Sequence, residues 1–145
     1  MKAINPYLNF NGNTEEAFNF YKSVFGGEFD AVMRFGDMPP MPDAPPAPAG
    51  IQQKIMHISL PLSTGGMLMG SDAIEGFGPP VSFGNNFYIS INAESKAEAD
   101  KLFNGLSSGG SVEMPMSDMF WGSYWGSFKD KFGTGWMISF GQQQN

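Results

Sequence analysis

The chain contains a copy of its own beginning, and this internal repeat restricts the fold more than any other feature. Each copy consists of a strand-like run, a turn, a helical pattern with acidic residues in its first turn, and a glycine pair. The first copy covers residues 3–27 and the second covers residues 86–110. A period of a little over half the chain indicates two structural modules rather than a solenoid of short repeats. Two such modules can face each other and enclose a cavity, and small ligands bind preferentially in cavities between modules.

The hydrophobic periodicity predicts the same order of elements in both modules. The first module has a strand, a helix and three further strands, at residues 2–10, 14–25, 28–35, 53–60 and 67–71. The second has the same series, at residues 87–92, 96–105, 111–114, 121–128 and 136–140. We therefore predict an α+β fold of two tandem βαβββ modules. In this fold the sheets are curled and mostly antiparallel, and the helices pack outside them.

Glycine and proline mark the boundaries of the modules. We expect one domain over residues 1–145, with module one at 1–72, a linker at 73–85 and module two at 86–141. Residues 142–145 form a polar tail. A further segment, residues 36–50, holds six prolines and is expected to be a loop of polyproline character. Its role stays open between a passive hairpin connection and a lid or partner contact.

Composition excludes several classes of function. The net charge is −6 and the chain has eight Lys and Arg residues, which do not form a basic stripe, so we expect no nucleic-acid partner. The absence of cysteine excludes disulfides, thiolate metal sites and a cysteine nucleophile. We find neither a signal peptide nor an apolar run long enough to span a membrane, so we expect a cytoplasmic protein.

Several motifs resemble PhnB-like proteins, also called demethylubiquinone methyltransferase-like proteins. These are a branch of the vicinal oxygen chelate superfamily, which includes glyoxalase I, bleomycin resistance proteins and extradiol dioxygenases. The resemblance covers nearly the whole chain and implies the two-module fold predicted above. The motifs that carry it are Tyr7–Asn13, Phe20-Tyr21, Val24–Gly27, Met56-His57-Ile58, Leu68–Asp72, Trp121-Gly122, Phe128-Lys129-Asp130 and Trp136.

The same resemblance implies where a metal would be held. Enzymes of this superfamily typically bind a divalent ion through His and Glu or Gln side chains on the inner strands of both modules. The corresponding positions fall on or near Pro6, Met69, Tyr88 and Ser139. Hard and borderline divalent ions need imidazole or carboxylate donors, and these residues supply none. We therefore expect no metal cofactor at the usual superfamily site.

Candidate ligand contacts combine aromatic, thioether and small polar side chains. His57 is the only histidine of the chain. In a functional role it would act as a general base or orient a ligand. The alternative is a structural histidine that is held by hydrogen bonds. Alternation places it with Ile55 and Ser59, on the opposite side of its strand from Met56 and Ile58. The aromatic residues either line a cavity or belong to the sheet core or a dimer contact. The proposed cavity residues are Tyr7, His57, Met69, Tyr88, Trp121 and Ser139.

These observations favour a protein that binds a small apolar or aromatic molecule in its cavity without a catalytic metal. His57 and Ser139 would be its polar contacts, and whether any catalysis occurs stays open. The alternative is a metal-dependent lyase, isomerase or dioxygenase of the same superfamily, with a displaced metal site that uses His57. By analogy with proteins of this fold, we also expect a homodimer.

Overall fold

The computed structural model describes residues 1–39, 42–43, 46–76 and 78–141. Parts of the proline-rich segment 36–50 and the whole of the predicted tail 142–145 therefore lie outside the described residues. The chain divides into two compact units, unit 1 at Met1–Ser82 and unit 2 at Phe83–Asn145. The boundary between them falls inside the segment 73–85.

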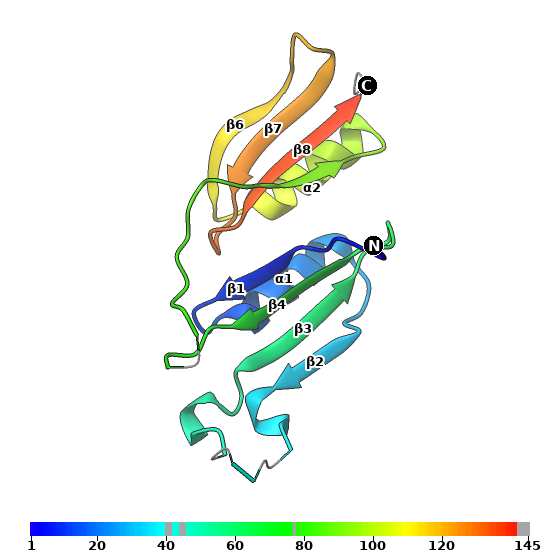
Figure 1. Ribbon diagram of the computed structural model, residues 1–145. Helices are drawn as coiled ribbons and strands as arrows, with labels where there is room; N and C mark the ends of the chain where they lie inside the picture. The colour runs from blue at the N-terminus through cyan, green and yellow to red at the C-terminus, as the bar shows by residue number, and fades with distance from the viewer. Residues whose placement is uncertain (40–41, 44–45, 77, 142–145) are drawn as a thin grey trace. The chain divides into compact units, whose positions relative to one another are not determined.

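The described residues of unit 1 form a four-stranded mixed sheet with one α-helix (Figure 1). In the sheet, the strands lie in the order β1-β4-β3-β2, β1 and β4 run parallel, and the other neighbours are antiparallel. Two short 3₁₀ helices, Phe35–Asp37 and Ala49–Ile51, lie between β2 and β3. The main elements are β1 (Tyr7–Phe10), α1 (Thr14–Phe25), β2 (Ala31–Arg34), β3 (Ile55–Pro61) and β4 (Met67–Asp72).

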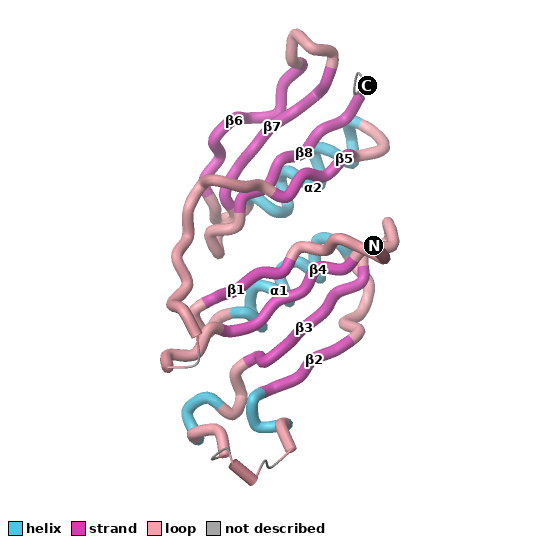
Figure 2. The backbone as a smooth tube through the Cα atoms, viewed as in Figure 1, coloured by secondary structure: helices cyan, strands magenta, loops and turns pink. Residues whose placement is uncertain are grey.

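Unit 2 repeats this topology strand for strand (Figure 2). Its sheet has the order β5-β8-β7-β6, again with one parallel pair, β5 with β8. The two βαβββ modules predicted from the sequence repeat are thereby confirmed. The elements are β5 (Ile89–Asn92), α2 (Lys96–Ser107), β6 (Ser111–Asp118), β7 (Ser123–Lys129) and β8 (Gly135–Gly141).

In each unit the helix packs on one face of the sheet, and this layer forms the core. In unit 1, Ala17, Phe18 and Tyr21 of α1 are fully buried. In unit 2, α2 contributes buried Ala99, Phe103 and Leu106. Alternate strand residues meet these side chains, because neighbouring residues of a strand point to opposite faces. They include Leu8, Phe10, Ile58, Leu60 and Leu68 in unit 1, and Phe128, Trp136 and Ile138 in unit 2.

Most strand boundaries differ from the predicted ones by a few residues. The first strand begins at Tyr7 rather than residue 2, directly after Pro6, which has no N–H to donate to a ladder. The strand predicted at 28–35 is shorter, at Ala31–Arg34, and the one at 111–114 is longer, at Ser111–Asp118. The strand predicted from residue 121 begins at Ser123, because Gly122 (φ 95°) belongs to the preceding turn.

One predicted alternation is wrong at the start of β3. Met33 pairs with His57, but Arg34 pairs with Ile55, so Met56 has no partner of its own and the register shifts. Such a bulge moves the residues before it to the other face. Ile55 is consequently buried in the core and does not share a face with His57.

The helix starts are only partly those predicted from the sequence. Ser95 caps α2 by accepting a hydrogen bond from the Glu98 N–H, as its capping pattern indicates. Asn13 makes no side-chain cap for α1. The cap comes instead from Asp72 at the end of β4. Among the described residues, neither helix is long and apolar enough to cross a membrane.

Candidate functional site

The face of each sheet that points away from its helix carries most of the candidate residues. In unit 1, alternation and strand pairing define this helix-free face. On β1 and β4, Tyr7 lies opposite Met69, and Asn9 lies opposite Ser71. Met67 of β4 lies on the same face. On β2 and β3 the face consists of Ala31, Met33, His57, Ser59 and Pro61.

The structure brings three of the predicted site residues of unit 1 together. The Tyr7 hydroxyl lies 3.3 Å from His57 Nδ1, and the two ring centroids are 5.8 Å apart. Met69 is the strand partner of Tyr7. Tyr7 is exposed, whereas His57 and Met69 are partly buried. A phenol, an imidazole and a thioether thus line one patch that offers both apolar contact and neutral hydrogen bonding.

The helix-free face of unit 2 is rich in serine. Ser139 on β8 lies opposite Trp125 on β7 and beside Asn92 on β5. Its hydroxyl donates a hydrogen bond to Asn92 Oδ1. Ser90, Ser123, Ser127, Met137 and Ser117 occupy further positions on this face. Ser139 is the predicted site residue on this face, and Trp125 is its strand partner there.

The other two predicted residues of unit 2 lie next to this face. The Tyr88 hydroxyl donates to the Glu113 carboxylate (2.7 Å to Oε1), and Lys129 Nζ lies over the Tyr88 ring. The hydrogen bond to Glu113 raises the pKa of Tyr88, so this phenol gives up its proton less readily than an ordinary tyrosine. Trp121 is 45% exposed in the turn before β7 and packs edge-on against Trp125 at a centroid distance of 6.2 Å.

Sequence reasoning missed a polar pair that occurs once in each unit. Asn9 on β1 accepts a hydrogen bond from Ser71 on β4 (3.2 Å between Ser71 Oγ and Asn9 Oδ1). Asn92 on β5 accepts the equivalent bond from Ser139 on β8. Both pairs are opposite residues of a parallel strand pair. The signal for them was present in the internal repeat, since both asparagines lie in the strand that precedes the helix.

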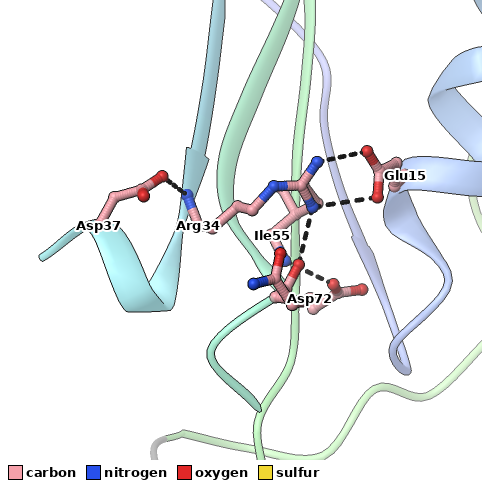
Figure 3. A network of polar contacts seen from close by, with 6 residues as sticks. Glu15, Arg34, Asp37, Ile55 and Asp72 are labelled. Atoms are coloured by element: carbon pink, nitrogen blue, oxygen red, sulfur yellow. Dashed lines mark hydrogen bonds and ion pairs between the residues drawn. The ribbon is translucent and has the colours of Figure 1, made fainter. Parts of the chain in front are cut away.

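A second polar cluster in unit 1 holds elements together rather than lining the helix-free face (Figure 3). The Arg34 guanidinium of β2 binds both carboxylate oxygens of Glu15 on α1 and also donates to the Gln53 carbonyl. The Arg34 N–H donates to Asp37 Oδ2 in the following 3₁₀ helix. This bidentate ion pair lowers the pKa of Glu15. Its geometry is that of a structural clamp between helix and sheet.

The residues at the usual superfamily metal positions fit a divalent ion poorly. Met69 offers a soft thioether, the Ser139 hydroxyl is bonded to Asn92, and the Tyr88 hydroxyl is bonded to Glu113. Within residues 1–39, 42–43, 46–76 and 78–141, no three His, Cys, Asp or Glu side chains gather in a group that could hold a metal. His57 is the one imidazole of the chain.

Comparison with known proteins identifies relatives along almost the full length of the chain. The model of the Glyoxalase/Bleomycin resistance protein/Dioxygenase superfamily matches residues 3–138. Protein YjdN of Escherichia coli (strain K12) is 31% identical over 146 residues, covering 97% of this chain and 97% of that protein.

Solved structures give the same result for the fold. Protein PA1353 from Pseudomonas aeruginosa is 41% identical, with a TM-score of 0.83, and the match covers 99% of this chain and 100% of that one. A Bacillus cereus structure titled as a putative 3-demethylubiquinone-9 3-methyltransferase, PhnB protein, is 24% identical. Its TM-score is 0.74, with 96% and 99% of the two chains covered. The latter similarity shows a shared fold.

Proposed function

Because this chain belongs to the glyoxalase/bleomycin resistance protein/dioxygenase superfamily, we propose that it binds a small apolar or aromatic molecule without a catalytic metal. The observation that carries the proposal is the composition of the helix-free faces. They bring Tyr7, His57 and Met69 together in unit 1, and Trp125 and Ser139 in unit 2. Ligand sites in proteins are mostly apolar and aromatic, with a few placed polar groups, and these faces have that composition.

The donor chemistry supports binding without a metal. At the positions where relatives of this fold typically place imidazole and carboxylate ligands, this chain has a proline, a thioether and two hydroxyls. The hydroxyls of Tyr88 and Ser139 already donate to protein acceptors. A binding protein of this kind sequesters its ligand through shape, apolar contact and neutral hydrogen bonds, and none of these needs a Lewis acid.

The first experiment measures binding of a plain aromatic probe. Titration of the full-length protein with 2-methylnaphthalene should quench tryptophan fluorescence saturably, because Trp125 lies on the unit 2 face. It should also raise the melting temperature, since a ligand that binds only the folded state stabilises it. Met69→Lys places a charge on the unit 1 face and should weaken binding by about tenfold or more. Met38→Lys makes the same change at an exposed site outside the strands and should leave binding unchanged.

Two results would contradict the proposal. One is the absence of saturable binding for any aromatic probe. The other is a stoichiometric divalent metal in the purified protein that is lost in His57→Ala. The second result would overturn binding without a metal and favour the alternative, a metal-dependent lyase, isomerase or dioxygenase. Elemental analysis and thermal shifts with Ni²⁺, Zn²⁺, Mn²⁺ and Fe²⁺ are expected to show no stoichiometric ion.

A further inference from the structure

One imidazole and two thioethers occur together on the helix-free face of unit 1. His57 of β3 pairs directly with Met33 of β2, and Met69 of β4 pairs with Ser59, two residues from His57 on the same strand. Strand β3 lies between β2 and β4 (Figure 1). Directly opposite residues have Cβ atoms about 4.5–5.5 Å apart, and diagonal neighbours are within reach of long side chains. The His57 ring therefore has a methionine on each side.

The Tyr7 hydroxyl engages one nitrogen of this imidazole. It lies 3.3 Å from His57 Nδ1, and within the described residues it is the one hydrogen-bond partner of the ring. A metal-binding histidine typically donates its other ring N–H to an acceptor, which fixes the tautomer and the orientation of the ring. When Nδ1–H is donated to the Tyr7 oxygen, Nε2 keeps its lone pair for a ligand.

The charge of this face favours a monovalent ion over a divalent one. None of the described strand positions on the face carries Asp, Glu, Lys or Arg. The cost of taking an ion out of water rises with the square of its charge, so neutral donors alone compensate a monovalent ion more readily. Thioethers are soft donors that select Cu(I), and imidazole also suits copper. Met33 is 41% exposed, which leaves a path for an ion to reach the donors.

The second module repeats only part of this arrangement. Met137 of β8 occupies the position that Met69 occupies in unit 1. In place of the histidine–methionine pair, however, unit 2 has Trp125 opposite Ser117. An indole N–H is a donor only and has no lone pair for a metal. The imidazole with a thioether on each side is thus a feature of unit 1 and not a general consequence of the repeated fold.

We propose that His57, Met33 and Met69 bind a soft monovalent metal ion, Cu(I), through Nε2 and the two thioether sulfurs. Tyr7 is a positioning residue, which acts through the imidazole. This inference goes beyond the proposed function, because it concerns an inorganic ion held by donor atoms rather than an apolar molecule held by surface contact. It also differs from the divalent centre of the alternative function, which needs carboxylate or further imidazole ligands.

Silver(I) is the probe, because it shares the charge and softness of Cu(I) and is stable in air. Calorimetric titration of the full-length protein with AgNO₃ in chloride-free buffer should give saturable binding of about one ion per chain. Binding should also raise the melting temperature. Because His57 is the only histidine, its ¹⁵N resonances are assigned without ambiguity. Silver should shift Nε2 while Nδ1 keeps its proton. Cu(I), added without oxygen, should displace the silver.

Conservative variants test each donor. Met33→Leu removes a sulfur but keeps the side-chain size, and should weaken silver binding by about tenfold, whereas His57→Phe should weaken it by about a hundredfold. Tyr7→Phe should weaken it by about tenfold and should let the imidazole proton exchange between Nδ1 and Nε2. The matched control is Met114→Leu, on an exposed position of β6 (46% exposed), which should change the affinity by less than about twofold.

The outcomes separate this inference from the proposed function. The site is wrong if silver does not bind saturably, if it binds without shifting the His57 resonances, or if Met33→Leu and Met114→Leu lose affinity equally. These results leave the proposed function standing, because 2-methylnaphthalene tests it separately. Silver binding by a protein that binds no aromatic probe would refute the proposed function alone. If Tyr7→Phe matches wild type in affinity and spectrum, the positioning role is wrong. Melting temperatures within about 2 °C of wild type show that the variants are folded.

Discussion

The carboxylate of Asp72 caps α1 from a neighbouring strand. Its Oδ1 accepts hydrogen bonds from the Thr14 N–H (3.0 Å) and hydroxyl (2.6 Å). Its Oδ2 accepts one from the Ile55 N–H (2.8 Å) (Figure 3). Asp72→Ala leaves these buried donors without an acceptor, and each such loss costs about 1–3 kcal/mol. We predict that Asp72→Ala lowers the free energy of unfolding by about 3 kcal/mol or more, as measured by urea denaturation.

The matched control is Asp30→Ala, at an exposed position before β2, which should change stability by less than about 0.5 kcal/mol. An Asp72→Ala protein as stable as the control would refute the capping role. The local sequence offers Asn13 and Thr14 as caps for α1. Asp72 could not be predicted, because it follows Thr14 by 58 positions and only the β1–β4 pairing brings the two residues together.

Glu15 makes the stability of the clamp dependent on pH. The hydrogen bond and charge of Arg34 lower the pKa of Glu15, so the folded state favours the ionised carboxylate. The resulting stability is fully present above the unfolded-state pKa of about 4.3 and is lost as pH falls through the lower folded-state value. Because the Glu15 side chain is 48% exposed, we expect an effect within about 1 kcal/mol.

The measurement is the difference in unfolding free energy between about pH 7 and about pH 3. Glu15→Gln should show a smaller acid-induced loss than wild type, since it has no carboxylate to protonate. Glu16→Gln, the same change one position along, should retain the wild-type loss. If acid lowers the free energy of unfolding equally in the Glu15→Gln protein and wild type, the Glu15–Arg34 pair is not the origin of the pH dependence.

Among the elements, the close contact of helix and sheet depends on a glycine in each unit. A Cβ added at Gly70 of β4 would lie 2.7 Å from the Phe18 ring, and one at Gly126 of β7 would lie 2.8 Å from the Phe103 ring. Backbone carbonyl oxygens lie nearly as close to both positions. The aromatic ring of the helix therefore packs directly on the strand backbone in both sheets.

We predict that Gly70→Ala and Gly126→Ala each lower the free energy of unfolding by about 1–3 kcal/mol, because overpacking forces rings and backbone apart. Gly50→Ala is the control, since its Cβ would meet nothing within 4 Å. It should be neutral or slightly stabilising through the unfolded state. If urea denaturation gives equal stability for Gly70→Ala and Gly50→Ala, the helix is not held against the strand as the structure shows.

The elements themselves follow from local patterns, and their ends depend on neighbours. The end of α1 at Phe25 was predicted from Gly26-Gly27, and its start was predicted to within one residue from Glu15 and Glu16 in its first turn. The face predicted for Ile55 of β3 was wrong, because the bulge that changes it arises from pairing with β2. The helical spacing of the apolar residues is enough to indicate which side of each helix meets its sheet. Gly70 and Gly126 were not singled out, since only helix packing reveals what they accommodate.

For the whole molecule, the topology could be predicted from the repeat and the motifs, and the family is confirmed by the comparisons. Of the candidate site, Tyr7, His57 and Met69 were chosen from sequence and share one face. The internal repeat places an asparagine in the strand before each helix, but the Asn–Ser pairs were missed because nothing local indicates which residue each asparagine contacts. Their partners lie on β4 and β8, far along the chain, and strand pairing sets that contact.

At this scale we also predict self-association into a homodimer. Phe120 is 97% exposed and Trp121 45% exposed in the turn between β6 and β7, and their rings pack edge-to-face at a centroid distance of 5.1 Å. Burying an exposed aromatic side chain contributes about 1.5–3 kcal/mol, and adjacent exposed aromatics are typical of interaction surfaces. The monomer mass is 15.8 kDa. Light scattering should therefore give about twice this value at micromolar concentration.

Aromatic-to-serine variants test whether the dimer contact depends on Phe120 and Trp121 or on exposed apolar side chains in general. Phe120→Ser combined with Trp121→Ser should shift the mass toward the monomer and weaken association by about tenfold or more, because two aromatic contacts are removed. Phe87→Ser removes another exposed phenylalanine, before β5, and should leave the dimer intact. A wild-type mass near the monomer value would exclude the dimer. A dimer that survives the double substitution would place its contact away from this turn.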